Sequence, residues 1–253
     1  MTPDSVTISL PQAPVIKGAL EKNVQIHLSY ISESSNLGAD VVVFPELSLT
    51  GYELDLADQL SYQQEPDEFR MLSESSVKNN IVVIAGYPLK TEKSKPSIGA
   101  VIFFPNGYIE YYSKQYLHTG EDTYFSPGKE DYLFSIKNYR IAVAICADFS
   151  NPSHSANAVL NGADMYIASA LISEHAYQAD ARILSKIASK HKMPVLLSNH
   201  ISQTGGWPAC GRNTVWDSSG EVVLTSGNKD KCIVLCTFFD ENLIGFTKKI
   251  SVG

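Results

Sequence analysis

The sequence predicts an α/β fold, formed as one domain by residues 1–253, with mixed rather than purely parallel sheets. Short runs of β-branched residues alternate with longer segments of helical spacing, which indicates helices covering a largely β core. Helical crossovers between strands produce parallel pairs, and hairpin signals between some of the runs indicate antiparallel pairs as well. At 253 residues and 44% hydrophobic composition, the chain is long enough for one large core.

Strands are predicted where short apolar runs end at turn residues. These are Val6–Leu10, Asp40–Phe44, Ile81–Tyr87, Ala100–Phe104, Tyr108–Ser113, Arg140–Ile145, Met165–Ala168, Pro194–Asn199, Arg212–Trp216, Val222–Thr225 and Cys232–Phe238. Helices are predicted over Gly18–Ser35, Pro66–Asn79, Ser155–Asn161 and Glu174–His191. Pro105-Asn106-Gly107 and the turn from Asp217 to Gly220 are hairpin signals, and Gly162 can take the left-handed conformation that ends a helix.

Composition and charge narrow the class of partner. The formal net charge is −7, and no basic cluster occurs beyond the short stretch Lys90–Lys95, which argues against a nucleic-acid surface. The N-terminus lacks an apolar secretory core and no apolar run is long enough to span a bilayer, so we expect a cytoplasmic protein without a membrane partner. The four cysteines show neither metal-site nor disulfide-scaffold spacing, and no metal or cofactor is expected. A small-molecule partner is favoured.

Glu46 follows a continuous apolar run that is typical of a strand buried on both faces. Ligands of α/β folds gather at the carboxyl ends of such strands, where a carboxylate can act as a general base. A solvated or helix-capping acid is the alternative, and it is the more common role for an acid in this position.

Lys114 follows an aromatic-rich strand, and Glu121 comes seven residues later in a loop. Alternation places Lys114 on the face of Tyr112 and Glu110, which favours an exposed lysine on an edge strand. The functional alternative is a buried ammonium between carboxylates, which stabilises a developing oxyanion.

Cys146 ends the apolar run that starts at Ile141, and a polar turn follows at once. A buried cysteine can simply pack as a small hydrophobe. At a turn from strand to helix, however, backbone N–H groups converge and favour a thiolate or an oxyanion. This segment alone leaves the two roles evenly balanced.

Taken together, the three segments resemble the motifs of the carbon–nitrogen hydrolase (nitrilase) superfamily. FPELSLTGY is similar to its first motif, YSKQYLHTGEDTYFSPG to its second, and RIAVAICADFSNPSHSANAVLNGADMYIASA to its third, in the family's order. The resemblance implies a four-layer α-β-β-α sandwich with two central mixed sheets, commonly paired into homodimers. It also implies that Glu46 is the general base, Lys114 stabilises the oxyanion, Cys146 is the nucleophile and Glu121 orients Lys114.

Tyr52 and the stretch from Ser169 to Leu171 fall where the family lines its pocket, and an ordinary core or turn role is an equal alternative for each. His118 is a possible pocket residue, although a loop histidine is the more common role. Ala147 and Asp148, directly after Cys146, are further candidates for contact with substrate. Ala147 also offers a backbone N–H to an oxyanion, whereas Asp148 suits a helix cap as well as a substrate amine. True nitrilases typically carry Trp-Glu after the nucleophile. The Ala-Asp pair of this chain therefore favours an amide over a nitrile as substrate.

The sequence thus predicts cysteine-dependent hydrolysis of a non-peptide C–N bond in a small linear amide or N-carbamoyl compound. A thioester intermediate would release ammonia or an amine. Nitrile hydrolysis or acyl transfer by the same residues is the alternative, as is a catalytically silent module used for binding or dimerisation. A low pKa of the Cys146 thiol, seen as fast alkylation, is expected of an active enzyme.

Overall fold

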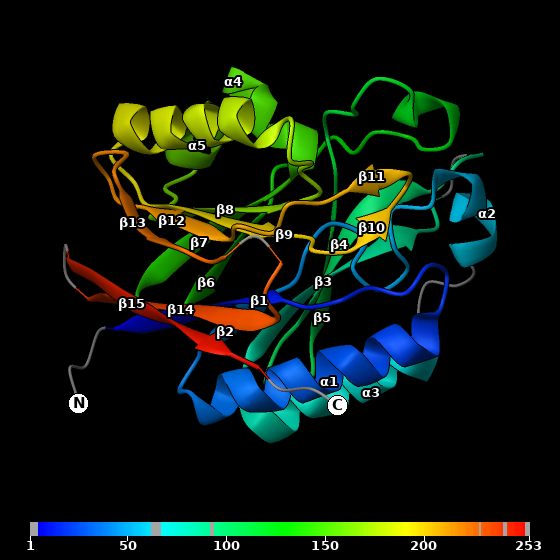
Figure 1. Ribbon diagram of the computed structural model, residues 1–253, viewed down its shortest axis with the longest axis horizontal. Coiled ribbons are helices and arrows are strands. Elements are labelled where there is room, and N and C mark those ends of the chain that lie inside the picture. The colour runs from blue at the N-terminus through cyan, green and yellow to red at the C-terminus, as the bar shows by residue number, and fades with distance from the viewer. Residues whose placement is uncertain (1–4, 62–66, 92–93, 228, 240–241, 251–253) are drawn as a thin grey trace.

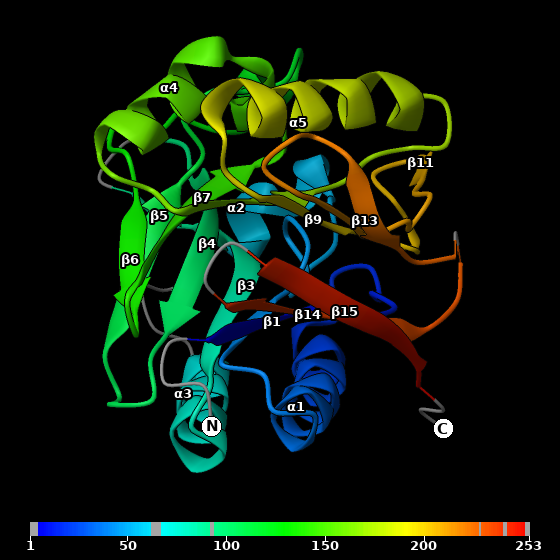
Figure 2. The ribbon, with the colours of Figure 1, turned by 90° about the vertical axis from the view of Figure 1, so that its left-hand side faces the viewer.

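The computed structural model describes residues 5–61, 67–91, 94–227, 229–239 and 242–250. Two sheets lie face to face, and helices cover the outer face of each, so the chain forms four layers (Figure 1). The view turned by 90° shows the same stacking, with α4 and α5 on one side and α1 and α3 on the other (Figure 2). The predicted α-β-β-α sandwich is confirmed.

The first sheet has seven strands in the order β15-β14-β1-β2-β3-β4-β5. Its three central strands β1, β2 and β3 run parallel, and antiparallel strands extend the sheet on both sides. The bounds are β1 Val6–Gln12, β2 Val41–Val43, β3 Val82–Leu89, β4 Ser97–Phe103, β5 Ile109–Ser113, β14 Cys232–Phe239 and β15 Asn242–Lys249.

The second sheet has six strands in the order β13-β12-β9-β8-β7-β6, again with a parallel centre formed by β7, β8 and β9. A separate two-stranded ribbon pairs β10 with β11. The bounds are β6 Leu133–Ile136, β7 Tyr139–Ile145, β8 Met165–Ala170, β9 Val195–Asn199, β10 Gln203–Thr204, β11 Trp207–Pro208, β12 Thr214–Trp216 and β13 Val222–Thr225.

The long helices are amphipathic and bury one face against a sheet. They are α1 Leu20–Asn36 and α3 Asp67–Asn79 on the first sheet, and α4 Pro152–Leu160 and α5 Tyr177–His191 on the second. Short helical turns occupy Leu54–Leu56, α2 Ala57–Leu60, Glu121–Thr123 and Cys146–Ser150. No helix of the described residues is both long and apolar enough to cross a membrane.

The central strands are buried on both faces, as their unbroken apolar runs predict. In β2, Val41 and Val43 pack between the two sheets while Val42 packs towards α1 and α3. In β7, Val143 packs between the sheets and Ala144 towards α4 and α5. Burial of both faces fixes the register of these strands, and so it also fixes the positions of the residues that follow them.

Helix and strand ends differ from the prediction for local reasons. α4 begins at Pro152 rather than Ser155, because the Asn151 side chain accepts the N–H of Ser153 and Pro152 suits the first helical position. The strand expected from Arg212 begins at Thr214, since Arg212 has a φ of 56° that no strand residue adopts.

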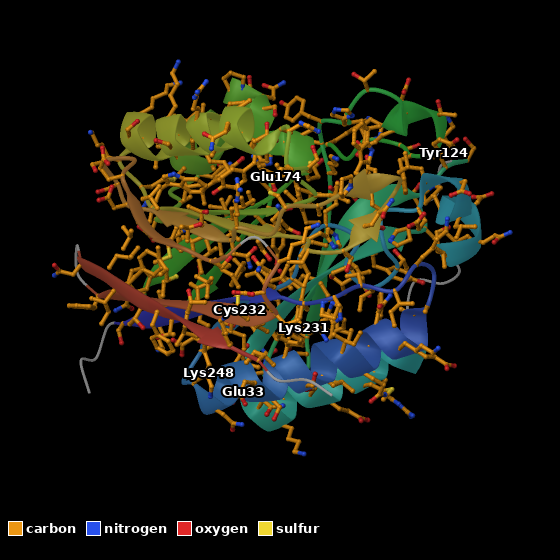
Figure 3. The ribbon with its side chains drawn as sticks, viewed as in Figure 1. Glu33, Tyr124, Glu174, Lys231, Cys232 and Lys248 are labelled. Carbon is orange, nitrogen blue, oxygen red and sulfur yellow. The ribbon has the colours of Figure 1, made fainter. Side chains whose placement is uncertain are left out.

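Strands β6 and β15 and the two-residue strands β10 and β11 were missed by sequence reasoning. Most residues of β15 are exposed, so it lacks the buried alternation by which a strand is predicted. It is an edge strand that pairs with β14 along its whole length. Lys248 on β15 also forms an ion pair of 2.6 Å with Glu33 on α1 (Figure 3). The predicted helix start at Pro66 lies outside the described residues.

Candidate active site

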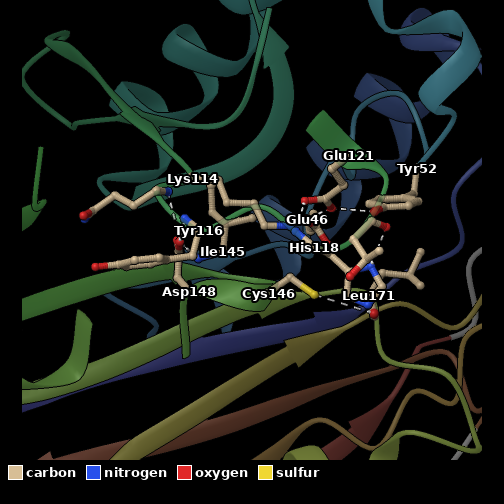
Figure 4. A network of polar contacts seen from close by, with 12 residues as sticks. Glu46, Tyr52, Lys114, Tyr116, His118, Glu121, Ile145, Cys146, Asp148 and Leu171 are labelled. Atoms are coloured by element: carbon tan, nitrogen blue, oxygen red, sulfur yellow. Dashed lines mark hydrogen bonds and ion pairs between the residues drawn. The ribbon is translucent and has the colours of Figure 1, made fainter. Parts of the chain in front are cut away.

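The two sheets bring Glu46, Lys114 and Cys146 together from three strand ends (Figure 4). Glu46 lies in the turn after β2, Lys114 directly follows β5, and Cys146 is the first residue after β7. Glu46 and Lys114 are fully buried, whereas Cys146 is half-buried. Two of these strands belong to the seven-stranded sheet and one to the six-stranded sheet, so the site forms where the sheets face each other.

The backbone that carries Glu46 crosses close over β3, where only glycine fits. A Cβ on Gly86 would lie 2.1 Å from the backbone nitrogen of Leu47, and Leu47 itself has a φ of 48°. Nε2 of His200 donates to the Glu46 carbonyl oxygen at 2.5 Å, and the hydroxyl of Ser48 receives the bond from the N–H of Gly86. These contacts hold the turn rigidly against both sheets.

Two serines of the second sheet hold the end of β2 from the opposite side. The hydroxyl of Ser169 donates to the carbonyl oxygen of Phe44 at 2.9 Å, and that of Ser198 donates to the carbonyl oxygen of Val43 at 2.8 Å. Ser169 is buried and lies outside the pocket described below. The structure therefore gives Ser169 a contact between sheets instead of the expected contact with substrate.

Lys114 is enclosed by two carboxylates. Its Nζ donates to Oε1 of Glu46 at 2.8 Å and to Oε1 of Glu121 at 2.7 Å. Burial by itself would lower the pKa of Lys114, but Glu46, the Cys146 sulfur and Glu121 outweigh it and raise that pKa. The lysine is therefore a permanent cation. The default expectation of an exposed lysine on an edge strand is wrong.

Glu121 uses both carboxylate oxygens to fix its position. Oε1 also accepts the hydroxyl of Tyr52 at 2.5 Å, and Oε2 accepts the backbone N–H of His118 at 2.6 Å. Burial and the nearby carboxylates Glu46 and Glu121 raise the pKa of Tyr52, which keeps its hydroxyl protonated as a donor. Glu121 and Glu46 thus hold Lys114 in place together.

Glu46 retains one free oxygen. Its Oε2 is buried and has no hydrogen-bond partner among the described residues. Burial raises the pKa of Glu46 to about 7, since desolvation and the charge of Glu121 outweigh the attraction of Lys114. Its pKa also depends on Cys146, so the two side chains are neighbours. A carboxylate with a free oxygen and a pKa near neutrality can exchange a proton with a thiol.

Cys146 sits in a strained turn. Its φ is 44°, and its Sγ lies 3.9 Å from the carbonyl oxygen of Leu171. Burial and the charge of Glu46 raise the pKa of the thiol well above its ordinary value, although Lys114 acts in the opposite direction. This direction is opposite to the expected low pKa. The resting side chain is therefore a thiol, with the Glu46 carboxylate as its neighbour.

Asp148 lies behind the pocket, and its carboxylate is saturated with hydrogen bonds. Oδ1 accepts the backbone N–H groups of Gln115 and Tyr116, both at 2.9 Å. Oδ2 accepts the N–H of Ile145 at 2.9 Å and the hydroxyl of Tyr112 at 2.7 Å. The bond from Ile145 caps the turn that begins at Cys146. Asp148 therefore acts as a cap, which was the alternative role, and the structure does not place it in the pocket as a substrate contact.

A pocket of about 320 Å³ opens onto Cys146. Of the predicted contact residues Tyr52, Ala147, Asp148 and Ser169, the first two line it among the described residues. Its remaining walls, which sequence reasoning largely missed, come from several elements: His118, Phe149, Ser150, Leu171, Ser173, Ala176, Asp180 and Trp207. No spacing in the sequence connects Asp180, within α5, or Trp207, on a two-residue strand, to Cys146.

Comparison with known proteins agrees with this fold. The sequence model of the carbon–nitrogen hydrolase family matches residues 7–239, and the chain belongs to that family. A probable nitrilase of Schizosaccharomyces pombe is 26% identical over 81% of this chain and 78% of its own length. A 2-oxoglutaramate amidase of Bacillus subtilis is 28% identical over 65% of this chain and 64% of its own length.

Solved structures show the same fold. A mutant of the amidase from Nesterenkonia sp. AN1, which shows Michael addition of acrylamide at the active site cysteine, superposes with a TM-score of 0.84. It is 19% identical, and the superposition covers 91% of this chain and 92% of that one. The predicted family membership is confirmed, and the chain is a carbon–nitrogen hydrolase.

Proposed function

We propose that this chain hydrolyses small linear amides or N-carbamoyl compounds through a thioester on Cys146. The observation that carries the proposal is the arrangement of Glu46, with a free buried oxygen, beside both a half-buried thiol and a buried lysine. A thiol near a carboxylate of pKa about 7 is a nucleophile with its base already in place. The two relatives above carry names of enzymes that act on nitriles or amides.

In the first half of the reaction, Glu46 takes the proton of Cys146 and the sulfur attacks the carbonyl carbon of the amide. Collapse of the tetrahedral intermediate breaks the C–N bond, and Glu46 returns the proton to the leaving ammonia or amine. In the second half, Glu46 removes a proton from water, the hydroxide attacks the thioester, and the thiol leaves with that proton. An amide gives a carboxylic acid as the second product, whereas an N-carbamoyl compound gives a carbamic acid, which then loses CO₂.

Lys114 and the backbone N–H of Ala147 are the proposed donors to the oxyanion. The ammonium of Lys114 stays charged throughout, and it needs no proton transfer to stabilise the developing negative charge. Ala147 lies at the start of a helical turn, where the first N–H groups have no acceptor within the helix. Glu121 and Tyr52 keep Lys114 in place, so they are proposed as positioning residues.

The proposal is tested by trapping the intermediate. Wild-type protein mixed with a panel of alkanamides and N-carbamoyl compounds should release ammonia, and an acid quench during turnover should leave an acyl group on the peptide that contains Cys146. The mass separates a thioester from the thioimidate that a nitrile would form. If no compound of a broad panel releases ammonia or labels Cys146, a silent module is the better description.

The rate should depend on pH through Glu46. Its pKa is raised to about 7, and only the ionised form accepts the thiol proton. Protonation of Glu46 therefore removes the base as the pH falls, so kcat/KM should drop by about tenfold for each pH unit below about 7. A neutral alkanamide keeps substrate ionisation out of the measurement. A profile that stays flat down to about pH 5 would contradict the role of Glu46 as base.

A further inference from the structure

The pocket at Cys146 is acidic. Besides Glu46, which pairs with Lys114, its one carboxylate among the described residues is Asp180. Neither a lysine nor an arginine lines it in the described part of the chain, and His118 at the rim is exposed. A substrate carboxylate would therefore meet Asp180 without a guanidinium or an ammonium to pair with, whereas a substrate cation would meet a carboxylate.

Asp180 is half-buried, and in the described structure its carboxylate has neither a hydrogen bond nor an ion pair. Burial raises its pKa, and the nearby His118 only partly counteracts this. The other acids at the site, Glu121 and Asp148, use both of their oxygens as acceptors. Partial desolvation without a partner is unfavourable for a carboxylate, and a bound cation would remove that cost.

A position in the first turn of α5 gives one other reason for an acid, because the helix dipole favours negative charge there. That effect needs no pocket. Glu21 likewise lies in the first turn of α1, where it is exposed and does not line the pocket. Replacing each residue in turn therefore distinguishes an effect of the helix dipole from an effect of a bound ligand.

Trp207 provides an aromatic wall in the same pocket. It is 54% exposed and lies on β11, whose partner strand β10 contains Thr204. The Thr204 hydroxyl accepts the N–H of Tyr52 at 2.7 Å and donates to Glu53 at 3.0 Å, which fastens this ribbon to the loop of Tyr52. An exposed indole on a fixed ribbon can pack against an alkyl chain or receive an ammonium group on the face of its ring.

We propose that the substrate is an amide with a cationic far end, a straight-chain ω-amino amide, and that Asp180 binds its ammonium beside Trp207. The inference rests on the proposed hydrolysis at Cys146 and names its substrate class. It also separates this chain from the Bacillus subtilis relative, whose name gives 2-oxoglutaramate, an amide that carries a carboxylate.

The test compares three matched series of amides of increasing chain length, ending in an ammonium, a methyl group or a carboxylate. At the best length, wild-type kcat/KM for the ammonium compound should exceed that of its neutral isostere by about tenfold or more, as expected for a charge-assisted hydrogen bond. The carboxylate compound should be the poorest. Asp180→Asn should bring the ratio of ammonium to neutral substrate close to one through KM.

Two further variants complete the design. Glu21→Gln removes the first-turn acid of α1 and should leave every ratio unchanged. Asp180→Lys should reverse the preference in favour of the carboxylate series. Hydrolysis of neutral amides without any preference for the ammonium series overturns the inference alone. If no compound of the three series is hydrolysed, the proposed function is overturned as well. Calorimetry then tests the inference separately, by measuring how ω-amino amides bind to Cys146→Ala with and without Asp180→Asn. Equal binding by the two proteins would overturn the inference.

Discussion

Cys146→Ala should reduce ammonia release by roughly four orders of magnitude or more, because no other group at the site can form the acyl intermediate. The other cysteines among the described residues are buried away from the pocket. The free energy of unfolding should change by less than about 1 kcal/mol, since a half-buried sulfur contributes little apolar burial. Steady-state ammonia release and urea denaturation measure the two quantities on the same preparation.

Cys236→Ala is the matched control. This thiol is fully buried in the core between the sheets, so its loss should lower the free energy of unfolding by about 1–2 kcal/mol and leave kcat/KM unchanged. The two variants should therefore separate activity from stability. Substantial turnover by Cys146→Ala would sink the thioester mechanism, whatever the behaviour of Cys236→Ala.

Lys114→Met should damage both activity and stability. Without the ammonium, Glu46 and Glu121 face each other in a buried site, and loss of one partner of a buried ion pair costs about 3–5 kcal/mol. The oxyanion also loses a donor, so kcat/KM should fall by about two to three orders of magnitude or more. Chemical denaturation and steady-state kinetics at pH 8 measure both effects.

The stability of Lys114→Met should depend on pH, and the two carboxylates set the sign of this dependence. Removal of Lys114 takes away the charge that lowers the pKa of Glu46, which is about 7 even with the lysine present. A carboxyl group whose pKa is higher in the folded state stabilises the fold only while it is protonated. The stability deficit of Lys114→Met should therefore be small near pH 5 and grow as the pH rises through about 7 and beyond.

A triple variant separates electrostatics from packing. Replacement of Glu46 and Glu121 by glutamine in the Lys114→Met background removes the facing charges. It should recover most of the lost stability at pH 8, while activity stays absent for want of a base. A deficit that persists in the triple variant would show that the lysine contributes packing rather than charge balance.

The strand ends could be predicted from the sequence because their physics is local. Unbroken apolar runs before Glu46 and Cys146 identify strands buried on both faces, and parallel strands bring their carboxyl ends to one edge of a sheet. The order of the three motifs along the chain then matches the order in the family. Both the α-β-β-α fold and the family membership are confirmed, whereas the homodimer, the cytoplasmic location and the single domain remain predictions.

The rest of the site depends on contacts between distant segments. His200 is 154 residues from the carbonyl of Glu46 that it binds, and no local pattern indicates this pairing. Asp148 follows Cys146 closely enough to suggest a substrate contact, yet its Oδ1 accepts the backbone N–H groups that follow Lys114. The expectation of a low thiol pKa rested on the helix start alone, whereas burial and the carboxylate of Glu46 beside the sulfur raise that pKa.

The four hydrogen bonds to Asp148 have a consequence for how the enzyme can lose activity. Asp148 follows a strand of the six-stranded sheet, while Gln115 and Tyr116 follow an edge strand of the other sheet. The carboxylate thus links the two sheets and fixes the distance between them at this point. The site residues are divided between the sheets, so neither sheet alone can catalyse the reaction. A partly folded state in which both sheets are formed but not packed together would therefore be inactive.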